Sequence, residues 1–273
     1  MKNTVFELQK ITFAYPQSAP VLEGLNLTIR EGERVSVLGA NGCGKSTLLK
    51  ILAGLLFPQE GSFRAFGEPM EQKRLNGEAA GRYHRRVGFV FQNSEAQLFC
   101  STVYEELAFG PLQLGMPRAE IERRIGELAR MLGVEKLLDL PPYHLSGGEK
   151  KKIAIGSALI LNPDVLILDE PTNSLDPRSQ AWLLRLLQAL GGAGKTLIFA
   201  THNLELVPHV SDRAVLFDEN RAIAADRPVA ELLRDAELLR RVNLVDEHYH
   251  THPWDFEQYP PQSKFPPQDA SEP

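Results

Sequence analysis

The chain has few of the features that mark disulfide-rich, secreted or membrane-spanning proteins. Only two cysteines occur among its 273 residues, Cys43 and Cys100, and their spacing does not form a CxxC motif. This argues against a disulfide framework and fits a reducing cytosol. No apolar stretch approaches the roughly 18–20 residues that cross a bilayer, and the first residues lack the apolar segment of a signal peptide. The composition is otherwise that of a folded globular protein, with 43% hydrophobic and 24% charged residues.

An excess of basic residues is also absent. The net charge is −5, and it lies at the end of the chain, because residues 246–273 contain six acidic side chains and one basic side chain, Lys264. The preceding 245 residues are therefore neutral overall. A neutral body lacks the electrostatic footprint of a nucleic-acid-binding protein, so we expect no nucleic-acid partner.

Hydrophobic patterning predicts strands that alternate with helices. Strands are expected at residues 5–13, 25–29, 34–38, 62–66, 87–91, 165–168, 196–200 and 214–217, and helices at 46–55, about 148–161 and 177–190. From residue 102 to 140 the pattern is helical, with Ile121, Ile125, Leu128 and Leu132 on one face. The polar residues 71–86 are expected to form a surface loop or an insertion.

This alternation predicts an α/β fold with a mostly parallel sheet and helices on both faces. We expect one domain over residues 3–241, into which a helical segment of about residues 93–160 is inserted. Residues 242–273 contain three alternating histidines and six prolines, a composition that predicts poor order. Imidazole suits nickel, cobalt, copper and zinc, but a cloning remnant or a solvated tail is the more economical interpretation of His248, His250 and His252.

A glycine-rich loop follows the strand predicted at residues 34–38. Its residues are Gly39, Ala40, Asn41, Gly42, Cys43, Gly44, Lys45, Ser46 and Thr47, and they fit the P-loop pattern. Glycines let backbone N–H groups point inward at phosphate oxygens, and the following helix adds the positive end of its dipole. Lys45 is expected to bridge the β- and γ-phosphates, and Ser46 to bind Mg²⁺. Since a strand precedes the loop and a helix follows it, the loop predicts binding of a nucleoside triphosphate rather than a chance match.

Two carboxylates end another predicted strand. Asp169 and Glu170 follow the apolar residues 165–168, at the edge where parallel α/β sheets bind their ligands. Alone, such a pair is more often a plain strand terminus. Together with the P-loop, it predicts that Asp169 holds Mg²⁺ through water and that Glu170 polarises the attacking water as a general base.

A serine–glycine motif precedes the carboxylate pair. Its residues, Leu145, Ser146, Gly147, Gly148 and Glu149, lie at a predicted helix start, where backbone N–H groups, a hydroxyl group and the helix dipole can bind an anion. An ordinary helix cap would explain this motif alone. It does not explain the ordered set of P-loop, serine–glycine motif and carboxylate pair, which resembles the ATP-binding-cassette (ABC) ATPases over residues 1 to about 241.

The resemblance implies an ABC ATPase fold, with an antiparallel β subdomain beside the parallel core sheet, and ATP with Mg²⁺ as ligands. It also implies that Ser146, Gly147 and Gly148 bind the γ-phosphate held by the P-loop of a second ATPase subunit. Residues 174–176 would lie beside the interface between the two ATPase subunits. Because the chain has one P-loop and one serine–glycine motif, it must pair with an identical or paralogous subunit to work.

Three further residues take expected roles from the resemblance. Gln92 would contact Mg²⁺ and water, His202 would contact the γ-phosphate, and Tyr15 would stack on adenine. Each has a plainer interpretation: a solvated cap for Gln92, a core or surface position for His202, and a strand-end tyrosine of the core for Tyr15.

Further motifs indicate which branch of the ABC ATPases the chain resembles. Residues 91–99, 102–112 and 145–152 are similar to the energy-coupling-factor (ECF) importers of transition metals and vitamins, and residues 109–115 are especially similar to their cobalt and nickel members. We therefore expect an ATPase subunit on the cytoplasmic face of a membrane, bound to integral membrane transport subunits. Two alternatives are a soluble ABC ATPase of DNA repair or translation and a scaffold for metal-cluster assembly. The former usually carries long coiled coils or two cassettes, which this chain does not.

Attachment to membrane subunits is expected along residues 92–102 and the following helix. There Leu98, Phe99, Val103 and Tyr104 offer apolar surface to a short helix of the partner. For Val103, burial in the helical segment's own core is an equally good interpretation.

The cysteine of the P-loop invites a separate hypothesis. Cys43 lies next to a helix N-terminus, which can lower the pKa of a thiol and permit redox control. Small residues of several kinds fit this position, so a structural role is the more economical interpretation.

Overall fold

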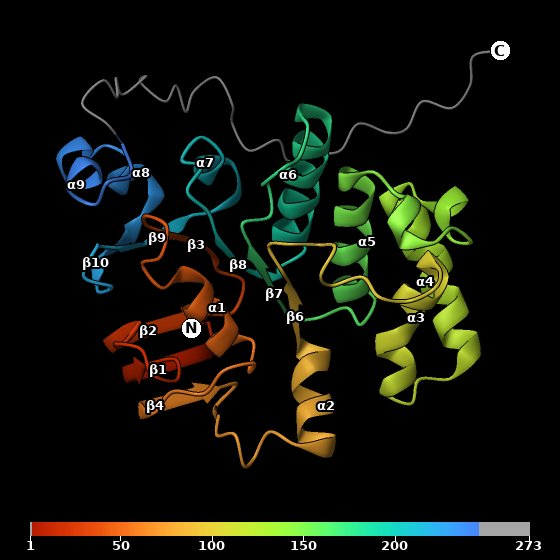
Figure 1. Ribbon diagram of the computed structural model, residues 1–273, viewed down its shortest axis with the longest axis horizontal. Coiled ribbons are helices and arrows are strands. Elements are labelled where there is room, and N and C mark those ends of the chain that lie inside the picture. The colour runs from red at the N-terminus through yellow and green to blue at the C-terminus, as the bar shows by residue number, and fades with distance from the viewer. Residues whose placement is uncertain (1, 246–273) are drawn as a thin grey trace.

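The computed structural model describes residues 2–245, and its strands form two sheets (Figure 1). The larger sheet has six strands in the order β10-β9-β3-β8-β7-β6. They are β3 (Arg34–Leu38), β6 (Val87–Val90), β7 (Val165–Asp169), β8 (Thr196–Ala200), β9 (Arg213–Phe217) and β10 (Ile223–Pro228). Neighbours pair in parallel except β10, which is antiparallel to β9. The predicted mostly parallel core sheet is therefore confirmed.

The smaller sheet is antiparallel, with four strands in the order β2-β1-β4-β5. They are β1 (Thr4–Phe13), β2 (Leu22–Arg30), β4 (Glu60–Ala65) and β5 (Glu68–Pro69). Helix α1 (Lys45–Leu52) lies between the two sheets (Figure 1). Its buried leucines and Ile51 share one hydrophobic core with side chains from both sheets. Because α1 packs against both sheets, the position of the P-loop that precedes it is set by both of them.

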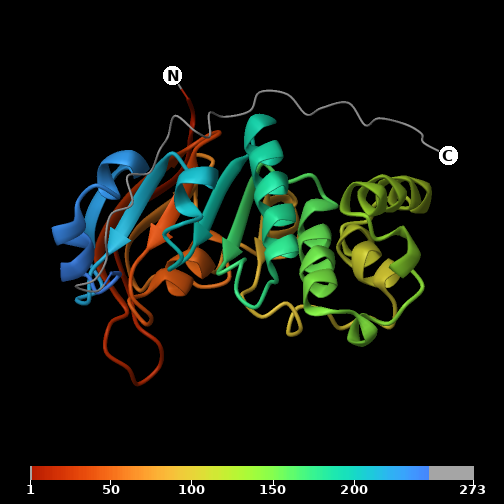
Figure 2. The same ribbon diagram turned by 90° about the horizontal axis from the view of Figure 1, so that it is seen from above.

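Between β6 and β7 the chain leaves the sheet and forms a helical lobe, which Figure 2 shows beside the sheet in yellow and green. The lobe contains α3 (Val103–Gln113), α4 (Arg118–Leu132), α5 (Gly147–Leu159) and the 3₁₀ helices η1 (Glu135–Leu137) and η2 (Pro142–His144). The predicted apolar face of α4 packs into the core of this lobe. Ala154 and Ile155 of helix α5 also pack in the core that includes side chains of the parallel sheet. Helix α5 therefore joins the lobe to the sheet.

Residues 71–86 differ from the expected surface loop, because residues 77–86 form helix α2 (Gly77–Arg86). Tyr83 is the one buried residue of this helix, and it donates its hydroxyl hydrogen to the carbonyl oxygen of Leu52. A helix with one buried side chain leaves little apolar periodicity in the sequence.

The remaining helices are α6 (Pro177–Gly192), α7 (Val207–Val210), α8 (Val229–Leu232) and α9 (Ala236–Arg241). Packing continues past the predicted boundary at residue 241, since Val242 is buried in the same core as α8 and α9. The predictions for residues 246–273, including both interpretations of the three histidines, lie outside the described residues. Within residues 2–245, no helix combines the length and the apolar character that a membrane span needs.

Candidate functional site

The parallel sheet brings the predicted site residues to one edge. Gly39 follows β3, Glu170 follows β7, and His202 comes two residues after β8. Gln92 comes two residues after β6. Because β3, β8, β7 and β6 are neighbours that run in the same direction, the segments after them meet at their carboxyl ends, where α/β folds bind ligands.

The backbone of the P-loop requires its glycines. Gly39 has a φ of 148° and Gly44 a φ of 107°. A Cβ atom on Gly39 would lie 2.6 Å from Sγ of Cys43, and one on Gly44 would lie 2.8 Å from Cδ2 of Leu22. The loop therefore curls in a form that side chains at these positions would prevent.

Lys45 extends back over the loop. Its Nζ donates hydrogen bonds to the carbonyl oxygens of Gly39, at 2.7 Å, and of Ala40, at 3.0 Å. The ammonium group thus lies against the loop that would hold a phosphate chain. Asn41 and Gly42 complete the exposed turn of the loop, and Thr47 lies in the first turn of α1.

Tyr15 stands beside this helix. Its hydroxyl oxygen lies 3.3 Å from Oγ1 of Thr47, within hydrogen-bond distance. Its ring packs edge-on against Phe13, with 5.0 Å between the centroids. The side chain is 37% exposed, so a planar base next to the P-loop could stack on it.

The two carboxylates after β7 have different surroundings. Asp169 is buried, and its Oδ1 accepts a hydrogen bond of 3.0 Å from Oγ of Ser46. Burial raises the pKa of the Asp169 carboxyl, and the hydrogen bond from Ser46 opposes that rise. A hydroxyl oxygen beside a carboxylate is the kind of oxygen donor set that Mg²⁺ prefers. Ser46 and Asp169 therefore fit the metal predicted for them.

Glu170 is buried in a left-handed backbone conformation, with a φ of 43°. Its Oε1 lies 3.0 Å from Nδ1 of His202, so the ring and the carboxylate share a hydrogen bond. Its Oε2 is buried and has no hydrogen-bond partner within residues 2–245. Buried polar atoms rarely stay unpaired, and backbone strain clusters at functional sites. Both features point to an acceptor position kept for a water or ligand atom.

The serine–glycine motif begins α5 with a capping box. The backbone N–H and the hydroxyl of Ser146 both donate to Oε2 of Glu149, at 2.8 and 2.6 Å, and these bonds lower the pKa of Glu149. A Cβ atom on Gly148 would lie 2.5 Å from Oγ of Ser179, in the first turn of α6. A Cβ atom on Gly147 would meet no described atom within 4 Å. The motif is therefore packed on the side of Gly148 and open at Gly147.

A cavity of about 740 Å³ connects several of these groups. It is lined by Gln92, Asn93, Ser94, Glu95, Gly147, Lys150, Lys151, Asn173, Ser174, Leu175 and His202. The predicted residues Gln92 and His202 thus face the same space as the start of α5 and residues 174–175, which are far apart in the sequence.

Lys151 is a member of this lining that the sequence did not single out. It is only 3% exposed, and its Nζ donates to the carbonyl oxygen of Gln92 at 3.0 Å and reaches that of Phe91 at 3.5 Å. Burial lowers the pKa of Lys151, and the charge of Asp169 opposes this. Three successive lysines at positions 150–152 suggest a solvated helix face, so no sequence signal separates Lys151 from its neighbours.

The structure decides between the alternatives stated for Val103 and Cys43, and in both cases it favours the structural role. Val103 is 0% exposed and packs in the core of the helical lobe, so it offers no docking surface. Leu98 is half-buried, whereas Phe99 is 66% exposed and packs edge-on against Phe109. Cys43 is buried, and burial raises the pKa of its thiol, so the lowered pKa that redox control would need is not found.

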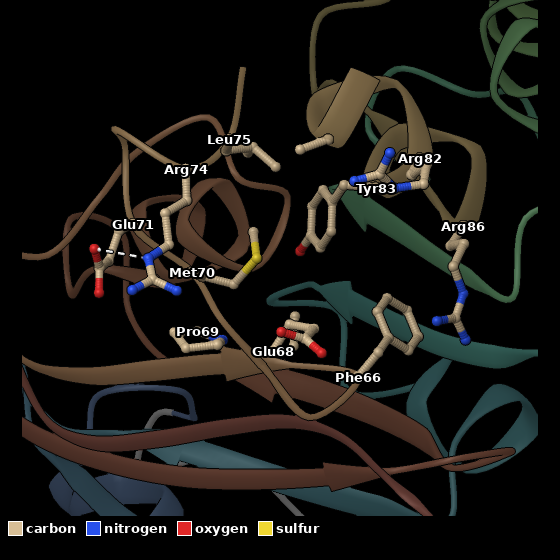
Figure 3. Close-up of a pocket in the computed structure, with 12 residues that line it drawn as sticks. Phe66, Glu68, Pro69, Met70, Glu71, Arg74, Leu75, Arg82, Tyr83 and Arg86 are labelled. Atoms are coloured by element: carbon tan, nitrogen blue, oxygen red, sulfur yellow. Dashed lines mark hydrogen bonds and ion pairs between the residues drawn. The ribbon is translucent and has the colours of Figure 1, made fainter. Parts of the chain in front are cut away.

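A second cavity, of about 540 Å³, lies between α2 and the β4–β5 hairpin (Figure 3). Its charges are largely satisfied by local partners. Arg74 pairs with Glu71 at 3.2 Å, and Arg86 lies over the Phe66 ring while its Nε pairs with Asp164. Its lining comes from residues 65–86 and contains no predicted site residue. We therefore assign the candidate site to the P-loop edge of the sheet.

Comparison with known proteins identifies the class to which this fold and site correspond. The family model for ABC transporters matches residues 22–173, more than half of the chain. The chain belongs to the ABC transporter family, as an ATP-binding subunit of the kind that hydrolyses ATP to power transport.

Two individual relatives support membership of the ABC transporter family and indicate a branch within it. The nickel import ATP-binding protein NikO of Rhodobacter capsulatus is 49% identical over 244 residues, which cover 88% of this chain and 95% of NikO. The energy-coupling factor transporter ATP-binding protein EcfA of Methanocaldococcus jannaschii is 39% identical over 240 residues, 88% of this chain and 85% of EcfA. The predicted ABC family and its ECF branch are therefore confirmed.

A solved structure supports the fold. The structure of cbiO1 from Clostridium perfringens, described as part of the ABC transporter complex cbiONQ, superposes with a TM-score of 0.75 at 32% identity. The match covers 89% of this chain and 96% of cbiO1. The predicted ABC ATPase fold, with its antiparallel subdomain and helical insertion, is confirmed.

Proposed function

We propose that this chain is the ATP-hydrolysing subunit of an ECF-type importer of nickel or cobalt ions. The observation that carries the proposal is the near full-length similarity to a nickel import ATP-binding protein, at 49% identity. The ECF relatives whose names give no substrate keep a vitamin importer as the second candidate. We place the subunit on the cytoplasmic face of the membrane, against integral membrane partners.

In the proposed reaction the P-loop holds the phosphates of ATP and Tyr15 stacks on its adenine. Lys45 exchanges the carbonyl oxygens of Gly39 and Ala40 for oxygens of the β- and γ-phosphates. Ser46, Asp169 and Gln92 would hold Mg²⁺, which neutralises charge on the phosphate oxygens when it is bound.

Glu170 acts as the general base. The hydrogen bond between Oε1 and Nδ1 of His202 orients the carboxylate, and the unpaired Oε2 can accept a hydrogen bond from the attacking water. A water held in this way loses its proton toward Glu170 as it attacks the γ-phosphate. The exposed side of the His202 ring is available to the γ-phosphate.

Each active site is shared between two subunits in this proposal. The open N-terminus of α5 at Gly147 presents backbone N–H groups, and Ser146 adds a hydroxyl. These groups bind the γ-phosphate on the P-loop of the other subunit. Closure of the dimer on ATP and its reopening after hydrolysis would drive the membrane subunits.

Contact with the membrane subunits is assigned to the exposed aromatic pair Phe99 and Phe109. Their ring centroids lie 4.9 Å apart, and both side chains are more than one third exposed. Phe99 lies in the same segment as Gln92, seven residues further along, and Phe109 lies on α3. A short apolar helix of the partner could pack on this pair.

An uptake experiment tests the substrate. The chain is expressed with membrane subunits encoded beside it in cells that lack their own nickel and cobalt uptake, and radiolabelled nickel and cobalt are measured. We expect uptake that is lost when Glu170→Gln replaces the wild-type chain. Absence of metal uptake by an assembled, ATP-hydrolysing complex would overturn the metal substrate, and vitamin binding by that complex would establish the second candidate.

A further inference from the structure

The segment that carries Gln92 is held by side chains rather than by a regular element. We call residues 91–100 the Gln92 segment. At its far end, Oε2 of the buried Glu106 on α3 accepts hydrogen bonds from the backbone N–H groups of Phe99 and Cys100, both at 2.9 Å. At its near end the contacts come from α5, the helix that begins at the serine–glycine motif.

Gln97 makes the first link between the Gln92 segment and α5. Its Oε1 accepts a hydrogen bond from the backbone N–H of Phe91 at 3.1 Å. Its Nε2 donates to the carbonyl oxygen of Ala154 at 2.9 Å and to Oγ of Ser157 at 3.1 Å. The N–H side of the Phe91 peptide is therefore tied to the middle of α5.

Lys151 makes the second link and reaches Gln92 itself. Its Nζ donates to the carbonyl oxygens of Gln92 and Phe91. Lys151 forms no ion pair with any residue that the structure describes, so these two carbonyls are its recorded partners. A buried ammonium group without them would be strongly disfavoured. The backbone at Gln92 and this point of α5 must therefore move together.

Neighbouring lysines on α5 make different contacts. Lys150 pairs with Glu95, whose side chain is largely exposed, and such surface pairs contribute little. The ammonium group of Lys152 lies 5.1 Å from the centroid of the Trp182 ring. Lys151 alone among these three lysines therefore holds the backbone of Gln92.

We propose that Lys151 is a positioning residue that couples the serine–glycine end of α5 to Gln92. Lys151 lies four residues after Gly147, which is about 6 Å along the helix axis. A phosphate bound at the start of α5 thus lies one turn from the residue that places Gln92. A shift of α5 on binding that phosphate would be passed through Lys151 to Gln92 in the hydrolytic site. The inference rests on the proposed role of Gln92 in that site.

Three variants of the full chain test this coupling. Lys151→Met keeps the length and apolar stem and removes the donors, Lys151→Arg restores donors, and Lys152→Met is the matched control. For Lys151→Met we expect kcat to fall about tenfold or more while KM for ATP stays within about twofold, because substrate binding is intact and the hydrolytic geometry is not. Lys151→Arg should recover most of the lost turnover, and Lys152→Met should behave as wild type.

Hydrogen exchange supplies a readout that is independent of activity. Peptides covering residues 90–99 should exchange faster in Lys151→Met, and at the wild-type rate in Lys152→Met. Thermal unfolding of each variant verifies the fold, and Lys151→Gln replaces Lys151→Met if the latter does not fold. Unchanged hydrogen exchange and unchanged kcat in a folded Lys151 variant would overturn the proposal. A fall in kcat in Lys152→Met as large as that in Lys151→Met would also overturn it.

One further variant separates this inference from the proposed function. Gln92→Ala should lose turnover without faster exchange at residues 147–157. If Gln92→Ala hydrolysed ATP at the wild-type rate, the role proposed for Gln92 in the reaction would be wrong. Faster exchange of the Gln92 segment in Lys151→Met would still establish the structural link.

Discussion

At the scale of single residues, Glu170 illustrates what the sequence predicts and what it does not. A carboxylate after an apolar strand, downstream of a P-loop, could be assigned as a base from the sequence alone. Its hydrogen bond to His202 could not, because it depends on β7 and β8 pairing so that Asp169 lies opposite Ala200. The unpaired Oε2 likewise follows from tertiary packing. Lys151 was missed for the same reason.

Replacement of Glu170 tests the chemistry. Glu170→Gln keeps the shape of the side chain and can still hydrogen-bond to His202, but it cannot accept a proton. We expect ATP binding to persist and turnover to fall at least about 100-fold, the contribution typical of a general base. Phosphate release and nucleotide binding by the purified subunit measure the two effects.

Lys45→Ala provides the contrast. It removes the ammonium group that lies over the P-loop, so tight ATP binding should be lost together with turnover. If Glu170→Gln released phosphate near the wild-type rate, Glu170 would not be the base. If Lys45→Ala bound ATP as tightly as the wild type, the assignment of the P-loop lysine would fail.

At the scale of elements, the strands of the core sheet were the most predictable. Strands β3 and β8 occupy the predicted residues because buried parallel strands are continuous apolar runs. Helix α2 was missed because Tyr83 is its one buried residue, which leaves no apolar face to recognise in the sequence. Helices α8 and α9 are short, and they are stabilised by the core they share with β9 rather than by a strong pattern of their own.

The aromatic pair on the helical lobe leads to an element-scale prediction. Phe99→Asp places a charge where an apolar partner helix would pack. Complex formation with the membrane subunits should weaken at least about tenfold, because burial of a phenylalanine side chain contributes roughly 1.5–3 kcal/mol. ATPase activity of the isolated subunit should stay within about twofold of wild type. Co-purification from detergent-solubilised membranes and phosphate release measure the two effects.

Met131→Asp serves as the matched control for Phe99→Asp. Met131 is 53% exposed on α4, so a charge there is also tolerated by the fold, and complex formation should be unchanged. Leu98 is less suitable as a test, since it packs against two hydrophobic cores and a charge would damage the fold. A Phe99→Asp subunit that still assembled and supported uptake would show that the membrane subunits bind elsewhere.

At the scale of the whole molecule, the order of the motifs predicted the family, and the arrangement of the two sheets and the helical lobe agrees with it. The assembly could not be derived from the chain's own packing. The P-loop lies at the edge of the core sheet before α1, whereas the serine–glycine motif begins a helix of the lobe with Gly147 open. A site completed by a second subunit is therefore a hypothesis that only the mixed assembly can test.

A mixture of two inactive chains tests this shared site most directly. Lys45→Ala disables the P-loop, and Ser146→Arg disables the serine–glycine motif, so each variant alone should hydrolyse little ATP. In a mixed dimer both defects fall in one composite site and the other site is intact. An equal mixture should regain about a quarter of wild-type turnover if half of the dimers are mixed and each has one working site. Strict coupling of the two sites would instead leave the mixed dimers inactive. Recovered activity in a species that light scattering in ATP shows to be monomeric would contradict the shared site.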